Sequence, residues 1–168
     1  MAAIRQLTDH FAVCAAPAVS GLDAIAAHGF LTVIDFRTGG EVADAGTATP
    51  AELQRASSAA GLTYVHIPAT KHDLLTDAVL AQTSAALQTA ADPVLAVCSS
   101  GQRAAIVWAA ATARSEPVEN VLATLARAGF DLAFLRDDLD AQADRQRWND
   151  TTPGAPSPAR TQSQLFAA

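Results

Sequence analysis

The sequence predicts an α/β fold in which a central, mainly parallel sheet is flanked by helices on both faces. Short apolar runs alternate along the chain with longer helical stretches, an order typical of right-handed parallel crossovers. The run "LTVIDF" is nearly continuous in apolar and β-branched residues, as expected of a strand buried on both faces. A chain of 168 residues is long enough to bury one sizeable core. We therefore expect a single domain built around this sheet.

Four apolar runs are predicted to form the strands. The second run, "LTVIDF", is rich in β-branched residues, which favour extended backbone. The third run is stopped by Pro68, because proline cannot donate a hydrogen bond to a strand ladder. The fourth run, "PVLAV", leads directly into Cys98. The predicted strands cover residues 11–14, 31–36, 62–68 and 93–97.

Helices are predicted between and after these strands, and capping residues mark their boundaries. Gly29 and Gly61 suit left-handed C-terminal caps. Thr49 can cap the N-terminus of a helix whose first turn is opened by Pro50. The last predicted helix is broken at Gly129. The predicted helices cover residues 21–29, 49–61, 74–91, 101–113 and 117–135.

The overall composition excludes several classes of protein. A formal net charge of -6 argues against nucleic-acid binding, which needs clustered Lys and Arg. No apolar run is long enough to span a bilayer, and the first residues lack the features of a secretory signal. Two distant cysteines and four scattered histidines predict neither a disulfide framework nor a metal site. We expect a cytoplasmic protein with reduced thiols and no cofactor.

The C-terminal segment is predicted to be a flexible tail. Residues 149–168 are rich in Pro, Ser and Thr and contain few large apolar residues. The ordered domain is therefore expected to cover residues 1–148.

The stretch after the fourth predicted strand is the strongest candidate for a functional site. Ligands gather at the carboxyl ends of the strands in such folds, and small residues after Cys98 allow successive N–H groups to form an anion-binding nest. The next helix adds its positive dipole end, and cysteines in such settings have a pKa lowered from about 8.5 to about 3.5–7.5. Cys98 is therefore a predicted nucleophile, and Arg103 supplies a charged fork for an oxyanion. The other residues predicted to hold the anion through their amides are Ser99, Ser100, Gly101 and Gln102.

Each of these roles has a structural alternative. A free cysteine is often a small buried core residue, and this is our interpretation of Cys14, with a resolving role left open. Arg103 would serve only the scaffold if a carboxylate such as Asp35 or Glu41 paired with it.

Arg37 and Asp73 follow the second and third predicted strands and are the remaining candidates. Arg37 is either a second cationic contact for the substrate or half of an ion pair with Asp35 or Glu41. Asp73 is either a general acid that protonates a leaving oxygen or the N-cap of the following helix.

The loop "CSSGQR" resembles the active-site loop of rhodanese-like sulfurtransferases, in which four residues separate the cysteine from the arginine. Cysteine-dependent phosphatases usually have five intervening residues. Five segments in order resemble the phosphatase-like, rhodanese-related domain of the beta-lactamase hydrolase-like family, over roughly residues 4 to 136. They are "RQLTDHFAV", "HGFLTVIDFR", "AAGLTYVHIP", "VLAVCSSGQRA" and "RAGFDLAFL".

This resemblance implies a dual-specificity-phosphatase-like fold and, through the family's association with persulfide dioxygenases, sulfur chemistry. Where the family usually carries an arginine directly after the cysteine, this chain has Ser99. A loop one residue shorter loses about 3.8 Å of contour, which favours a transferred sulfur atom over a tetrahedral phosphate.

We accordingly predict a cysteine-dependent sulfurtransferase. Cys98 would take sulfur from a small anionic donor, thiosulfate or a persulfide, and pass it to a thiol acceptor, with a persulfide dioxygenase as a partner. Two alternatives stay open: a phosphatase with a phosphocysteine intermediate and Asp73 as its acid, and a non-catalytic module that binds an oxyanion or a sulfur species.

Overall fold

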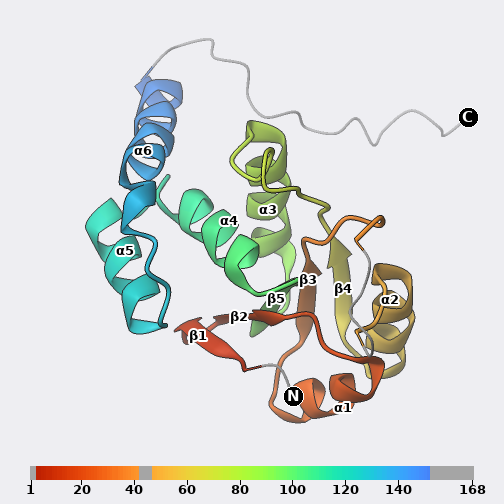
Figure 1. Ribbon diagram of the computed structural model, residues 1–168. Helices are drawn as coiled ribbons and strands as arrows, with labels where there is room; N and C mark the ends of the chain where they lie inside the picture. The colour runs from red at the N-terminus through yellow and green to blue at the C-terminus, as the bar shows by residue number, and fades with distance from the viewer. Residues whose placement is uncertain (1–2, 42–46, 152–168) are drawn as a thin grey trace, which may run out of the picture.

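The computed structural model describes residues 3–41 and 47–151 (Figure 1). A five-stranded sheet forms its centre, made of β1 (Arg5–Thr8), β2 (Phe11–Ala15), β3 (Thr32–Asp35), β4 (Thr63–His66) and β5 (Val94–Cys98). The strands lie in the order β1-β2-β5-β3-β4. β1 and β2 form an antiparallel hairpin at one edge, and all other neighbouring pairs are parallel. The predicted mainly parallel sheet is confirmed, with β1 as the strand that the sequence prediction missed.

Six α-helices and two short 3₁₀ segments surround the sheet within the described residues. They are η1 (Val19–Gly21), α1 (Leu22–Ala27), α2 (Pro50–Ala59), α3 (Asp77–Thr89), α4 (Gln102–Thr112), α5 (Val118–Arg127), η2 (Ala133–Leu135) and α6 (Arg136–Thr151). None of these helices is long and apolar enough to cross a membrane.

The helix boundaries follow local capping chemistry. Thr49 caps α2 as predicted: its hydroxyl accepts from the N–H of Glu52, whose carboxylate accepts from the N–H of Thr49 at 2.8 Å. α3 begins at Asp77 rather than at residue 74, because turns occupy the residues before it. α6 continues to Thr151, beyond the predicted end of the domain, and the rest of the predicted tail, residues 152–168, lies outside the described residues.

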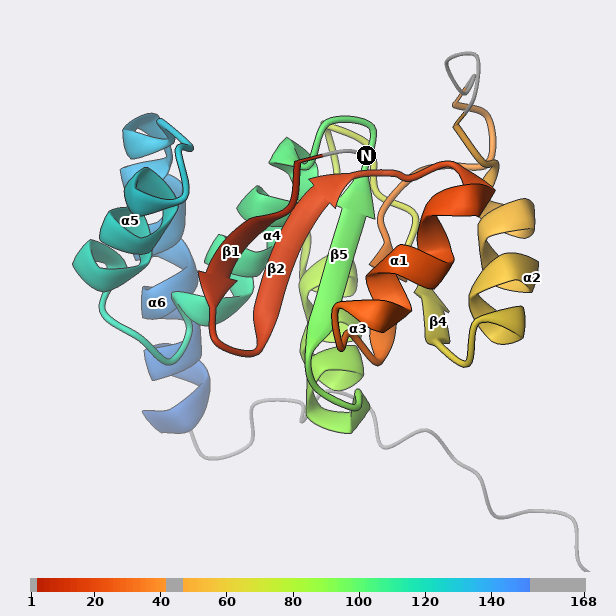
Figure 2. The same ribbon diagram turned by 90° about the horizontal axis from the view of Figure 1, so that it is seen from below.

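The two faces of the sheet carry separate apolar clusters. Residues of α3, α4, α5 and α6 pack on one face, and residues of α1 and α2 pack on the other (Figure 2). Along β5, side chains alternate between them: Ala96 and Cys98 belong to the first cluster, and Leu95 and Val97 to the second. The sheet is therefore covered on both faces, and Cys98 points into the layer that contains α4.

Candidate functional site

Cys98 is the last residue of the central strand, and the chain enters α4 four residues later. Its side chain is buried, and its sulfur accepts a hydrogen bond from the N–H of Gly101 at 3.1 Å. The first N–H groups of a helix have no intrahelical acceptor and carry the positive end of its dipole. The predicted placement of a thiol at the N-terminus of a helix is what the structure shows.

Gly101 determines the shape of this loop. Its φ of 84° lies in the left-handed region, and a Cβ at this position would lie only 3.1 Å from the carbonyl carbon of Cys14. The loop also rests on the end of β2 through a hydrogen bond from the N–H of Ala16 to the carbonyl oxygen of Cys98 at 2.8 Å. Glycine is required here both for the turn and for the close approach of two backbones.

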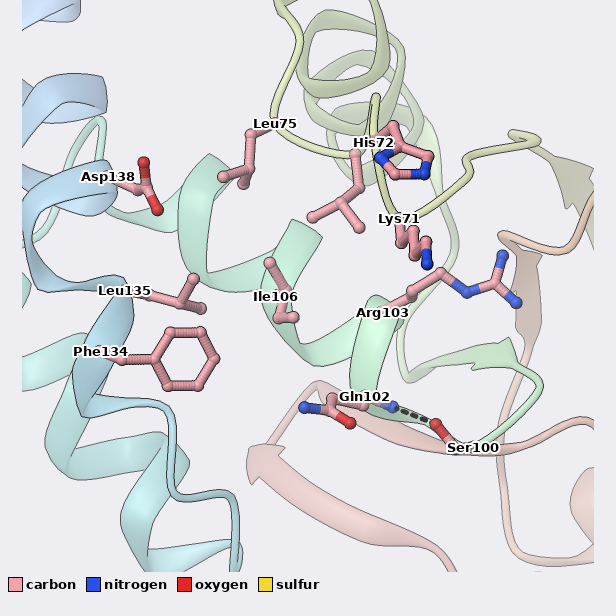
Figure 3. Close-up of a pocket in the computed structure, with 11 residues that line it drawn as sticks. Lys71, His72, Leu75, Ser100, Gln102, Arg103, Ile106, Phe134, Leu135 and Asp138 are labelled. Atoms are coloured by element: carbon pink, nitrogen blue, oxygen red, sulfur yellow. Dashed lines mark hydrogen bonds between the residues drawn. The ribbon is translucent and has the colours of Figure 1, made fainter.

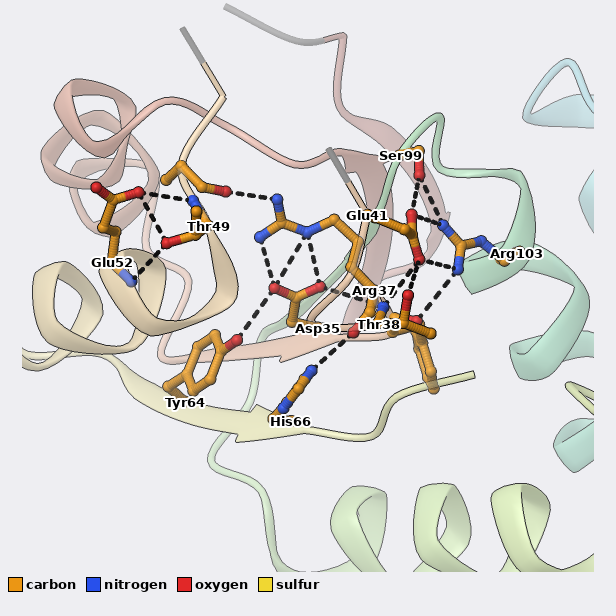
Figure 4. Close-up of polar contacts among 12 residues, drawn as sticks. Asp35, Arg37, Thr38, Glu41, Thr49, Glu52, Tyr64, His66, Ser99 and Arg103 are labelled. Atoms are coloured by element: carbon orange, nitrogen blue, oxygen red, sulfur yellow. Dashed lines mark hydrogen bonds and ion pairs between the residues drawn. The ribbon is translucent and has the colours of Figure 1, made fainter. Parts of the chain in front are cut away.

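Arg103 forms a two-pronged ion pair with Glu41 (Figure 4). Nη1 donates to Oε1 at 2.7 Å, and Nη2 donates to Oε2. Ser99 joins both partners, because its hydroxyl accepts from Nη2 at 2.6 Å and donates to Oε2 at 2.5 Å. Nη1 also donates to the carbonyl oxygen of Ala69 at 2.7 Å. Arg103 thus connects the start of α4 to the segments that follow β3 and β4.

Each member of this pair shifts the pKa of the other in the direction that favours its charged form. Hydrogen bonds from Arg103 are the main reason why the pKa of Glu41 falls to about 2. The pKa of Arg103 is raised, first by its hydrogen bonds to Glu41 and to a smaller extent by the nearby sulfur of Cys98. Of the two carboxylates considered as partners, the structure selects Glu41, and it also places the guanidinium close enough to Cys98 for the two to interact.

The lowered pKa of Glu41 predicts an acid-dependent loss of stability. Above pH 4.5 the carboxylate is ionised in both the folded and the unfolded chain, so the pair contributes fully. As the pH falls from 4.5 towards 2, the unfolded chain takes up the proton first, and this contribution is lost. Glu41→Gln should therefore lower the free energy of unfolding above pH 4.5, and its difference from wild type should shrink towards pH 2.

Urea unfolding at a series of pH values measures this difference. Glu119→Gln is a matched control, because Glu119 forms a similar two-pronged pair with Arg136 but its side chain is 74% exposed. Exposed pairs contribute little, so Glu119→Gln should stay close to wild type. If both variants gave the same dependence of the free energy of unfolding on pH, the Glu41–Arg103 pair would stabilise the fold no more than the exposed Glu119–Arg136 pair.

Arg37 lies in a different polar cluster. Its Nε donates to Asp35 Oδ1 at 3.0 Å, its Nη2 to Oδ2 at 2.6 Å, and its Nη1 to the carbonyl oxygen of Ala48 at 2.5 Å. Tyr64 donates to the same carboxylate at 3.0 Å, and its pKa is well above the usual value, mainly through burial. Figure 4 shows the guanidinium of Arg37 pointing away from Ser99 and Arg103. Of the two interpretations of Arg37, the structure shows the ion pair with Asp35. It does not bring the side chain of Arg37 to the cysteine loop.

Asp73 closes a turn before α3. Its Oδ1 accepts from the N–H of Thr70 at 2.5 Å and from the hydroxyl of Thr70 at 3.0 Å. Thr76, and not Asp73, is the N-cap residue of α3. Asp73 is therefore not the N-cap of α3, and an acid role for it belongs among the proposals.

A pocket of about 460 Å³ adjoins the cysteine loop (Figure 3). Ser100, Gln102 and Arg103 form its edge on the loop side, and Lys71 and His72 line it from the turn after β4. The sequence analysis missed Lys71 and His72 as site residues. Their position after the third predicted strand, whose carboxyl end lies at the same edge of the sheet as Cys98, was the signal that could have found them.

Cys14 is buried on the opposite face of the sheet from Cys98. Burial is the main reason why the pKa of its thiol rises to about 12, and Cys98 adds to the shift. Cys14 therefore stays protonated at neutral pH, as a core residue should. Among residues 3–41 and 47–151, no group of three or more His, Cys, Asp or Glu side chains could hold a metal ion.

Comparisons with known proteins agree with this geometry. The family model described as "Beta-lactamase hydrolase-like protein, phosphatase-like domain" matches residues 3–115. No curated protein matches the chain. A candidate phosphatase from Neisseria meningitidis has 26% sequence identity and a TM-score of 0.72, and the match covers 83% of this chain and 97% of that one.

Two further structures share the fold. A candidate phosphatase from Shewanella putrefaciens is 18% identical with a TM-score of 0.64, covering 86% of this chain and 92% of that one. The core catalytic domain of a PP-IP phosphatase from S. cerevisiae is 9% identical with a TM-score of 0.58, covering 88% and 90%. The predicted phosphatase-like fold and the family resemblance are confirmed.

The sulfurtransferase prediction is wrong, because the matched family is phosphatase-like and the similar structures are described as phosphatases. It relied on the number of residues between Cys98 and Arg103. In the structure, the turn at Gly101 and the start of α4 set the shape of the loop. The N-terminus of a helix accepts a phosphate readily, so the residue count does not separate the two kinds of chemistry.

Proposed function

Because the chain belongs to the phosphatase-like domain family of beta-lactamase hydrolase-like proteins, we propose that it hydrolyses phosphate monoesters through a phosphocysteine intermediate. The observation that supports this most directly is the sulfur of Cys98 at the N-terminus of α4, 3.1 Å from the amide nitrogen of Gly101. A phosphate held by the first amides of α4 would lie against this sulfur. This geometry supports the proposal of a nucleophile and an anion site next to each other.

The reaction proceeds in two displacements at phosphorus. The thiolate of Cys98 attacks, a sulfur–phosphorus bond forms, and the bond to the ester oxygen breaks as that oxygen takes a proton from a general acid. Water then attacks the phosphocysteine, which releases inorganic phosphate and returns the thiolate. Arg103 neutralises the charge that builds on the phosphate oxygens, and Glu41 and Ser99 keep its fork in place.

The turn after β4 supplies the general acid in this proposal. Asp73, the residue expected in this role, is hydrogen-bonded to Thr70, whereas its neighbour His72 lines the pocket. The imidazole of His72 is therefore a second candidate for the acid, and Asp73 can act once its bonds to Thr70 are released. Rates of Asp73→Asn and His72→Gln with esters of good and poor leaving groups distinguish the two candidates for the acid. The variant that lacks the acid should lose most activity with poor leaving groups, because these depend most on protonation.

Acid quenching during turnover of an aryl phosphate tests the proposal. Phosphorus should be recovered on the peptide that contains Cys98, in an amount that approaches one per chain when the second step is slower than the first. Cys14→Ser should give the same result, since Cys14 lies on the other face of the sheet.

The full burial of Cys98 favours one competing function, a non-catalytic anion-binding module. Phosphate binding without ester turnover would select that module and reject the phosphatase.

A further inference from the structure

The pocket beside the cysteine loop indicates what kind of alcohol the phosphate is attached to. Its volume of about 460 Å³ lies within the range of small-ligand sites, roughly 300–1,000 Å³. It begins at the loop residues Ser100 and Gln102 and extends along α4 to Ile106 (Figure 3). One end of the pocket adjoins the phosphate site, so the remaining length is available for the organic part of a substrate.

The middle of the pocket is apolar. Phe134 is 71% exposed although it is one of the largest apolar side chains, and Figure 3 shows its ring beside Leu135 and facing Ile106. An exposed ring in a pocket wall gains most by contact with another apolar, flat group. The apolar residues that line the pocket are Leu74, Leu75, Ile106, Phe134 and Leu135.

The charges of the pocket are divided between its two ends. Lys71, His72 and Arg103 lie on the side of the cysteine loop and suit a phosphate. Asp138 stands on the opposite side, on α6, where its carboxylate disfavours a second negative charge. This arrangement fits a substrate with one anionic end and an uncharged apolar body, and it does not fit a polyanion or a polyol phosphate.

The wall that carries Phe134, Leu135 and Asp138 comes from η2 and α6. These residues lie after residue 115, beyond the segment that the family model matches. The catalytic loop and its anion site are within the matched segment, but this wall is not. The far wall of the pocket therefore lies outside the segment matched by the family model, although the family-like segment "RAGFDLAFL" includes Phe134 and Leu135.

We propose that the substrate is a phosphate monoester of an aromatic or similarly flat apolar alcohol, and that Phe134 selects it. This inference rests on the phosphatase function proposed above and adds the organic half of the substrate to it. Phe134 is a specificity residue in this assignment, because its ring contacts the leaving group and takes no part in the transfer of phosphate.

The test compares the kcat/KM values for naphthyl phosphate and glycerol phosphate. Wild type should prefer naphthyl phosphate, and Phe134→Ala should lower the ratio of the two values by about tenfold, mainly by raising the KM for naphthyl phosphate. Trp148→Ala is the matched control, because Trp148 lies on α6, is 69% exposed and does not line the pocket. It should leave the ratio unchanged. Binding of naphthyl phosphate to Cys98→Ser, with and without Phe134→Ala, is measured by calorimetry.

The outcomes separate the two proposals. If the protein turns over both esters but Phe134→Ala does not change the ratio of the two kcat/KM values, the assignment of the pocket is overturned and the phosphatase proposal stands. The same holds if Trp148→Ala lowers this ratio as much as Phe134→Ala does. Absence of turnover together with Phe134-dependent binding rejects the phosphatase and supports the pocket. Neither turnover nor Phe134-dependent binding rejects both.

Discussion

Replacing Cys98 with serine should lower the rate of aryl phosphate hydrolysis by at least about a thousandfold, because the nucleophile of the first displacement is lost. The fold should survive, since serine is slightly smaller than cysteine and its oxygen can accept the N–H of Gly101 in place of the sulfur. Release of inorganic phosphate measures the rate. Binding of inorganic phosphate, followed by calorimetry, should be retained because the amides of α4 are unchanged.

Cys14→Ser is the control for this prediction. Cys14 is also buried, with 3% exposure against 0% for Cys98, but it lies in the apolar cluster on the other face of the sheet. Its variant tests the cost of placing a hydroxyl in the core without touching the loop, and the rate per folded molecule should stay near that of wild type. Turnover by Cys98→Ser comparable to that of Cys14→Ser would place the nucleophile elsewhere.

Arg103→Ala should lower kcat/KM by about 10²–10³-fold, the loss expected when one preorganised donor to a developing oxyanion is removed. Its removal also takes one donor away from each of Glu41, Ser99 and the carbonyl oxygen of Ala69, and it leaves the carboxylate of Glu41 without its ion-pair partner, so stability should fall as well. Arg103→Lys should recover part of the activity, because a lysine keeps the charge but cannot bridge both oxygens of Glu41. The rates are to be compared per folded molecule.

A matched arginine separates the catalytic effect from the structural one. The side chain of Arg114 is 19% exposed, against 17% for Arg103, and it pairs with Asp77 and with Gln142. Arg114→Ala should therefore lower stability by a similar route and leave kcat/KM near wild type. If the two alanine variants lose stability and activity in the same proportion, Arg103 belongs to the scaffold alone.

Most of the sheet could be predicted from the sequence because β2, β3 and β5 are buried and carry nearly continuous apolar runs. β4 is an edge strand without a buried residue, and its end was marked by Pro68. β1 could not be predicted, because it is an edge strand in which only Leu7 is buried, among Arg5, Gln6 and Thr8. So short and polar a pattern does not differ from that of a loop. A helix after the last predicted helix went unassigned for a similar reason, since α6 is mostly polar and contributes few residues to the core.

The cysteine loop was predictable because strand, small residues and helix follow each other without a gap. The partner of Arg103 was not, since Asp35 ends β3, Glu41 follows it, and both carboxylates are suitable. Three-dimensional contacts decide between them: Asp35 is already engaged by Arg37 and Tyr64, which leaves Glu41 for Arg103. The far wall of the pocket has no local signal at all, because it is assembled from residues about thirty positions after the loop.

The opposite orientations of the two cysteines also bear on how the protein withstands oxidants. Cys14 and Cys98 lie on adjacent strands, but their side chains leave the sheet on opposite faces, so a disulfide between them would require the strands to move. Cys14 and Cys98 are the only cysteines in the sequence. A sulfenic acid formed at Cys98 by peroxide therefore has no thiol within the chain to capture it. Its rescue depends on an external thiol or on condensation with a backbone nitrogen to a sulfenamide, and without either the sulfur proceeds to the irreversible sulfinic and sulfonic acids.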